Sequence, residues 1–278
     1  MVMTFLLAVC MMQWMDPQVL TAFAVTCAAG LATLIGGAWV LCFKTPNMRV
    51  LSFGLAFAAG AMVYVSLTEL LNKSIHAFSF QGNEAQSFAY ATGAFLLGLI
   101  LVLILDRFIP NPHENIESEH VFEGQKKLLK TGILTFFAIT AHNLPEGLAS
   151  FFATLDSPSL GAPLAFAIAI HNIPEGVAIA LPVYMATGRK DYAIWASLIA
   201  GLAEPFGAFI GYWILAPYMG QQLYGVIFGL IAGVMVYLAL DELLPTAKRY
   251  AKGHETVYGL VSGMTALASS LVVFKFIQ

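Results

Sequence analysis

The sequence predicts an all-α integral membrane protein in which eight transmembrane helices form a single domain over residues 1–278. Three observations support this fold class: the composition, the division of the chain into eight apolar runs, and an internal repeat. Hydrophobic residues make up 59% of the chain and charged residues 10%, and the mean hydropathy is +0.79. Because soluble domains carry about 25% charged residues, a soluble enzyme is excluded. The net charge of −3 gives no reason to expect a nucleic-acid partner.

The apolar runs follow one another along the chain and are separated by short polar breaks. Each is long enough for a membrane-spanning helix, which needs about 20 apolar residues. Only helices and closed barrels satisfy their backbone hydrogen bonds in lipid, and these runs are too long and continuous for barrel strands. The predicted helices cover residues 17–43, 50–72, 87–110, 128–154, 160–187, 191–216, 219–246 and 255–277.

The first run follows a short apolar lead, residues 1–15, which lacks the basic segment of a signal peptide. Asp16 and Pro17 are predicted to begin the first helix. Proline is tolerated there because the N–H that it lacks would have no partner within the helix.

The second and seventh runs are related by sequence. AGAMVYVSLTELL at 59–71 and AGVMVYLALDELL at 232–244 are identical at nine of thirteen positions, and they share a glutamate in register, Glu69 and Glu242. The two helices would cross the membrane in opposite directions, which predicts an inverted repeat that pairs helices 1–3 with helices 6–8 around helices 4 and 5. Inverted repeats are typical of secondary transporters, which bind substrate between the repeats near the membrane midplane.

The acidic residues of this repeat lie near opposite membrane surfaces. Glu69 is near the outer end of helix 2, whereas Asp241 and Glu242 are near the inner end of helix 7. We expect them to line the entrance and the exit of a transport pathway. The alternative is that they only cap or pack helix ends.

The third run is followed by a polar segment, residues 111–127, which is predicted to form an acidic cytoplasmic loop between helices 3 and 4. It contains His113 and His120 among acidic residues, which makes it a candidate for weak metal capture. The alternative is a solvated acidic loop without a binding role.

Positive charge predicts the orientation of the chain. Eleven of the thirteen lysines and arginines lie in or beside the breaks that follow the odd-numbered helices, and only Lys73 and Lys275 lie on the opposite side. Because cytoplasmic loops carry the excess of positive charge, those breaks are predicted to be cytoplasmic and both termini to lie outside.

The fourth and fifth runs carry the same motif, HNLPEG at 142–147 and HNIPEG at 171–176. The histidine and glutamate of each motif are four residues apart and therefore share a helix face. The proline removes one hydrogen bond within the helix, and the glycine lets a neighbouring helix approach closely. The candidate ligands are His142, Asn143, Glu146, His171, Asn172 and Glu175.

The sixth run adds Glu204, in GLAEPFGA at 201–208. A charged residue at the centre of a bilayer costs at least about 2.5–3.5 kcal/mol, and carboxylates without neighbouring cations repel one another. A bound metal cation, or protons in its absence, would relieve that repulsion. Imidazole, carboxylate and amide oxygen together suit Zn²⁺, Fe²⁺, Mn²⁺, Co²⁺ and Cd²⁺.

These motifs resemble those of the ZIP metal transporters, especially the short bacterial members with a broad substrate range. The resemblance rests on the paired HNxPEG motifs, GLAEPFGA in the sixth run and eight helices with outward termini. It implies a protein of the bacterial inner membrane that imports zinc, iron, manganese, cobalt and cadmium into the cytoplasm, without enzymatic activity or a catalytic cofactor. Its partners would be the lipid bilayer and the transported ions, and the sequence leaves a homodimer open.

The resemblance also implies a site for two metal ions at mid-membrane. The first ion would be held by His142, Glu146 and Glu175. The second would be held by Asn143, Asn172 and Glu204 together with the same two glutamates, which bridge the ions. The family directs a side chain of helix 2 toward the first ion, for which Glu69 is the candidate. The first-ion set does not require His171, so its loss is expected to be milder than that of His142.

Two other functions compete with transport. An intramembrane metal-dependent hydrolase would need three protein ligands and an open position for water, and the HExxH motif is absent. A cation channel could select ions with charged rings. A deep site with many ligands favours tight binding and alternating access instead.

Overall fold

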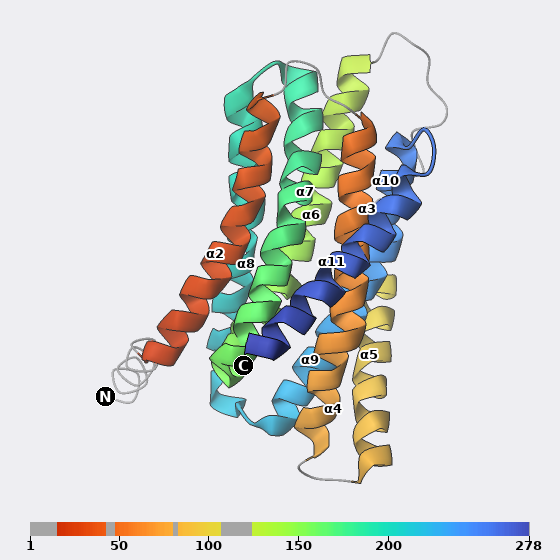
Figure 1. The fold of residues 1–278 in the computed structure, drawn as a ribbon. Coiled ribbons are helices and arrows are strands. Elements are labelled where there is room, and N and C mark those ends of the chain that lie inside the picture. The colour runs from red at the N-terminus through yellow and green to blue at the C-terminus, as the bar shows by residue number, and fades with distance from the viewer. Residues whose placement is uncertain (1–15, 43–47, 80–82, 107–123, 278) are drawn as a thin grey trace, which may run out of the picture.

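The computed structural model describes residues 16–42, 48–79, 83–106 and 124–277, and within these ranges the protein consists of helices without strands (Figure 1). This confirms the all-α fold class. The acidic segment with His113 and His120 lies outside the described residues, apart from the first turn of α6. The α-helices are α2 (Pro17–Trp39), α3 (Met48–Val65), α4 (Leu71–Ser79), α5 (Glu84–Asp106), α6 (Gly124–Asp156), α7 (Pro158–Thr187), α8 (Lys190–Leu215), α9 (Gln221–Leu238), α10 (Leu244–Tyr250) and α11 (Glu255–Ile277).

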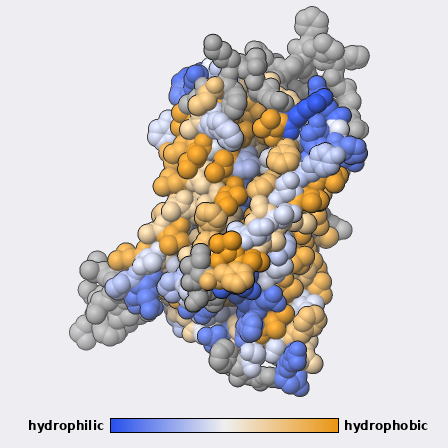
Figure 2. Space-filling view, in the orientation of Figure 1, coloured by the Kyte–Doolittle hydropathy of each residue, from blue (hydrophilic) through white to orange (hydrophobic). Residues whose placement is uncertain are grey.

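Seven helical stretches of the described chain are long and apolar enough to cross a membrane. They correspond to every predicted span except the fourth. That span is α6, which is 33 residues long but whose apolar sequence is interrupted by lysines at its start and by HNLPEG in its second half. Figure 2 shows hydrophobic residues over much of the visible face between the two ends of the molecule, with hydrophilic residues gathered near those ends. The chain is therefore an integral membrane protein.

The predicted start of the first helix is confirmed, whereas the fourth helix begins at Gly124, before the predicted 128 and inside the predicted loop, and two other helices end later than predicted. The first helix begins at Pro17, where the Asp16 carboxylate accepts a hydrogen bond of 2.8 Å from the Gln18 N–H. The helical stretches that correspond to the second and seventh predicted helices continue to Ser79 and Tyr250, beyond the predicted ends at 72 and 246. The apolar pattern stops where the side chains become polar, whereas the backbone stays helical for another one to two turns.

The helices pack as two sets (Figure 1). The first set contains α2, α6, α7 and α8, each of which packs against the other three. In the second set, α3 packs against α11, α5 packs against α9, and α4 packs against both α5 and α9. The main contacts between the sets join α7 to α3 and α11, and α6 to α9. The HNxPEG motifs therefore belong to the first set, and the repeated segments belong to the second.

Glycines of the HNxPEG motifs bring helices of the first set together. A Cβ on Gly147 of α6 would lie 2.0 Å from the carbonyl oxygen of Glu204 on α8. A Cβ on Gly176 of α7 would lie 1.9 Å from the carbonyl oxygen of Thr33 on α2. Both distances are far below van der Waals contact, so any side chain there would separate the helices. The close approach predicted for these glycines is confirmed.

Two π-helical turns occupy equivalent places in the repeated segments. Ser66–Leu70 joins α3 to α4 and Ala239–Leu243 joins α9 to α10, and Glu69 and Glu242 are each the fourth residue of their turn. The first turn packs against α9 and the second against α3, so the two segments lie side by side and run in opposite directions (Figure 1). Such turns are rare and are frequent at functional sites. The wider repeat of helices 1–3 and 6–8 stays a prediction.

Candidate metal site

The seven motif residues predicted to bind metal lie inside the first set of helices, and we call them the central site. None of their side chains is more than 2% exposed. The helices α6, α7 and α8 run without a break through Pro145, Pro174 and Pro205, so each motif presents its polar residues from a continuous helix. The members are His142, Asn143, Glu146, His171, Asn172, Glu175 and Glu204.

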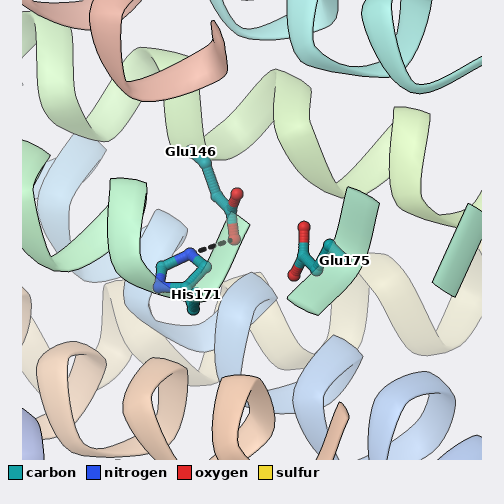
Figure 3. A group of neighbouring side chains, drawn as sticks. All are labelled: Glu146, His171 and Glu175. Atoms are coloured by element: carbon teal, nitrogen blue, oxygen red, sulfur yellow. Dashed lines mark ion pairs between the residues drawn. The ribbon is translucent and has the colours of Figure 1, made fainter. Parts of the chain in front are cut away.

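Three members lie close enough together to share one ion, and we call them the tight group. Glu146 of α6 and His171 and Glu175 of α7 each offer a ligand atom within 4.8 Å of the others. Figure 3 shows the Glu146 side chain reaching toward the two side chains from α7, with His171 Nε2 at 3.3 Å from Glu146 Oε1. One imidazole and two carboxylates at this separation match the donor set that Zn²⁺ and similar ions prefer.

The two asparagines are fixed by their nitrogen atoms. Asn143 Nδ2 donates to the carbonyl oxygen of Ala200 on α8 at 2.8 Å, and Asn172 Nδ2 donates to that of Ala29 on α2 at 3.0 Å. Both Oδ1 atoms are buried without a hydrogen-bond partner. Because each amide is held by its donor end, its oxygen remains available as a neutral ligand for a cation.

Glu204 connects α8 to this group. Its Oε1 accepts a hydrogen bond from Asn172 Nδ2, whereas Oε2 is buried without a partner. The charges of Glu146, Glu175 and Glu204 act on one another. Three mutually repelling carboxylates in one buried place are stable together only if protons or a bound cation neutralise part of their charge.

Unsatisfied polar atoms are concentrated in the central site. Each buried polar atom without a hydrogen bond costs about 1–3 kcal/mol, and more if it is charged. Within the described residues, all seven members carry at least one such atom, and both carboxylate oxygens of Glu146 and Glu175 are among them. Among the lysines and arginines whose side chains the structure describes, none is fully buried. The arrangement can therefore accept either an external cation or protons.

His142 differs from the expectation for the first ion. It lies outside the tight group, because its Nδ1 donates to the carbonyl oxygen of Ala138 on its own helix at 2.6 Å. This bond leaves Nε2, buried and without a hydrogen-bond partner, as the ring atom that can bind a metal. His171, and not His142, belongs to the tight group, and the assignment of either histidine to an ion stays a prediction. Helical spacing identified both residues, but it could not predict which way each ring turns.

Two cavities lie where the two helix sets meet, toward opposite ends of the bundle. The α4 cavity has a volume of about 620 Å³ and is lined by residues of α4, α9 and α11 with Asp156 at the end of α6; Glu69 lines it. The α5 cavity has a volume of about 370 Å³ between α5, α6 and α9, and His142, Asp241 and Glu242 line it. The structure thus places the repeated acidic residues in separate cavities, and Glu69 is not a member of the tight group.

Sequence reasoning missed three features of this arrangement. The π-helical turns have no signal in hydropathy, although the shared glutamates mark their position. The carbonyl groups of Ala29 and Ala200 that hold the amides carry no sequence signal. The cluster of Lys73 and Asp156 in the α4 cavity joins residues far apart in sequence, and only Lys73 stood out, as an exception to the charge distribution.

Comparison with known proteins gives a consistent result. Residues 111–271 match the family model described as "ZIP Zinc transporter". The chain is 63% identical to the zinc transporter ZupT of Stenotrophomonas maltophilia over 92% of this chain and 96% of that protein. It is 57% identical to ZupT of Neisseria meningitidis over the same shares, and 43% identical to ZupT of Corynebacterium aurimucosum over 91% of this chain and 97% of that protein.

Proposed function

The chain belongs to the ZIP zinc transporter family, and we propose that it imports divalent transition metals, zinc first among them, across a bacterial inner membrane. Membership confirms the prediction of a membrane transporter and excludes the hydrolase. The relatives in Stenotrophomonas maltophilia and Neisseria meningitidis are named for zinc, which supports zinc as a substrate. Iron, manganese, cobalt and cadmium are proposed because the same mixed nitrogen and oxygen ligands suit them.

The observation that carries this proposal is the central site. Glu146, His171 and Glu175 hold ligand atoms within 4.8 Å of one another in a place that water does not reach. We assign the first ion to these three residues, with His142 Nε2 as a fourth ligand during movement toward the α5 cavity. The second ion is assigned to the oxygens of Asn143, Asn172 and Glu204, with Glu146 and Glu175 bridging both ions.

The two cavities give this site one route to each side. We propose that α6 also crosses the membrane, which completes the eight predicted spans. The α4 cavity is then the entrance of the pathway and the α5 cavity is its exit. The orientation follows from positive charge. The starts of α3, α8 and α11 and the end of α10 lie at the same end of the bundle (Figure 1). The described basic loops are at this end, which is therefore assigned to the cytoplasm. The α5 cavity lies toward that end, and both chain termini are then outside. Alternating access would open one cavity at a time.

Transport can be tested directly with purified protein. The purified protein in liposomes should take up zinc with saturation, and a panel of iron, manganese, cobalt and cadmium should compete with it. Glu175→Ala supplies the inactive control. Uptake equal to that of the control would refute transport, whereas single-channel currents without saturation would favour the cation channel.

A further inference from the structure

The α4 cavity contains a lysine that the proposed transport does not use. Lys73 is one of the two cations that break the charge distribution of the sequence. It lines the cavity and is partly buried, with Nζ at 5.6 Å from the centre of the Phe228 ring. Phe228 is 1% exposed, so a cation–π contact holds the ammonium group against the cavity wall.

Two carboxylates act on this ammonium group. Glu69 lies one helical turn before Lys73, and Asp156 comes from the end of α6; the charges of both interact with Lys73. Lys73 belongs to the second helix set and Asp156 to the first. The lysine therefore contributes a positive charge where the two sets meet, beside carboxylates that an arriving metal would contact.

The α4 cavity is balanced in charge, unlike the central site. The residues that line it include the carboxyl side chains of Glu69 and Asp156, the amino side chains of Lys73 and Lys275, and the imidazole side chain of His76. A balanced cavity attracts cations weakly, because each carboxylate already has a positive neighbour. An ion that binds Glu69 or Asp156 must first displace that neighbour.

We propose that Lys73 is a tethered competitor for metal in the entrance cavity and thereby a determinant of ion specificity. This inference rests on the proposed function. A tethered group acts at an effective concentration of about millimolar, so an ion must bind the carboxylates better than Lys73 does. Zinc and similar ions gain a further ligand from His76, because they bind imidazole well. Mg²⁺ prefers oxygen ligands and loses its water reluctantly, so it gains little there and is rejected.

If the charge of Lys73 competes with metal, removing that charge should change zinc affinity and Mg²⁺ inhibition, which a purely structural role would not do. Lys73→Met keeps most of the length and the apolar character of the side-chain stem but removes its charge, and Lys73→Arg keeps the charge. We expect Lys73→Met to lower the zinc concentration for half-maximal uptake by about three- to tenfold, the effect of removing one nearby like charge from a partly solvated cavity. Millimolar Mg²⁺ should then inhibit zinc uptake by the Met variant but not by the Arg variant.

The experiment measures zinc uptake in liposomes by the wild type, Lys73→Met, Lys73→Arg and the inactive Glu175→Ala, with and without Mg²⁺. Calorimetric zinc titration of the same monodisperse preparations measures binding without transport. A wild type no more active than Glu175→Ala would refute the proposed function, and the titration would still test Lys73, because Lys73→Met should bind zinc more tightly than the wild type. The inference is wrong if Lys73→Met leaves half-saturation and Mg²⁺ inhibition unchanged, if it weakens zinc binding, or if Lys73→Arg behaves like Lys73→Met.

Discussion

The central site and the α4 cavity differ in whether positive side chains lie beside their carboxylates. The central site places Glu146, Glu175 and Glu204 in complete burial, and none of the lysine or arginine side chains that the structure describes is buried with them. The α4 cavity is partly open, and its carboxylates interact with Lys73, while Lys275 also lines the cavity. Neutralising the first region therefore takes protons or a cation from outside, whereas the second region contains Lys73. Binding strength and ion selection can thus be located in different parts of one pathway.

The largest expected difference between the two regions appears when one carboxylate is removed from each of them. Glu146→Ala or Glu175→Ala should reduce zinc uptake to the background of empty liposomes, because each residue is assigned to both ions. The protein should still fold, since the change removes an uncompensated buried charge. Asp156→Ala should leave clear uptake, because its carboxylate contributes only to the entrance. Normal uptake by either glutamate variant would disprove the assignment.

The next comparison concerns the histidines. The sequence led us to expect a milder loss for His171 than for His142, but the structure places His171 beside Glu146 and Glu175. Replacing a residue that merely supports a metal ligand costs about 10–100-fold in affinity, so His171→Ala should weaken zinc binding by at least that factor. We expect it to be as damaging as His142→Ala, with His76→Ala milder than both. Zinc titration and uptake at matched expression would check this order, which fails if His171→Ala is nearly normal.

A smaller effect is expected for the ligands of the second ion. The amides of Asn143 and Asn172 are neutral and weaker donors than carboxylates, so Asn143→Ala and Glu204→Ala should retain measurable uptake with altered preference among zinc, iron and manganese. Competition assays with these ions would measure the change. Variants as inactive as Glu175→Ala for every metal would show that the two ion positions work as one obligatory unit.

The smallest effect concerns protons. Metal ligands must be deprotonated to bind, so zinc binding to the central site should release protons. Calorimetry in buffers that differ in ionisation enthalpy should therefore give different heats for the wild type, and Glu175→Gln should reduce that difference. A heat that does not depend on the buffer would contradict proton linkage.

The sequence predicted the parts of this structure that hydrophobicity and helical spacing decide. Apolar runs become helices because lipid leaves the backbone no other partner, and a spacing of four places Glu146 on the face of His142. The ring orientation of His142 depends instead on the carbonyl of Ala138. The position of Asp156 near Lys73 depends on how the two helix sets pack. Neither can be derived from residue spacing, because each is decided by contacts between atoms.

The location of bound zinc tests the central claim most directly. Anomalous diffraction at the zinc absorption edge, from crystals of the zinc-loaded protein, would place each ion without reference to transport. We expect a peak among Glu146 of α6 and His171 and Glu175 of α7, with a second, weaker peak toward the oxygens of Asn143, Asn172 and Glu204. Peaks confined to the α4 cavity, or a zinc-saturated protein without a peak between α6 and α7, would contradict the account.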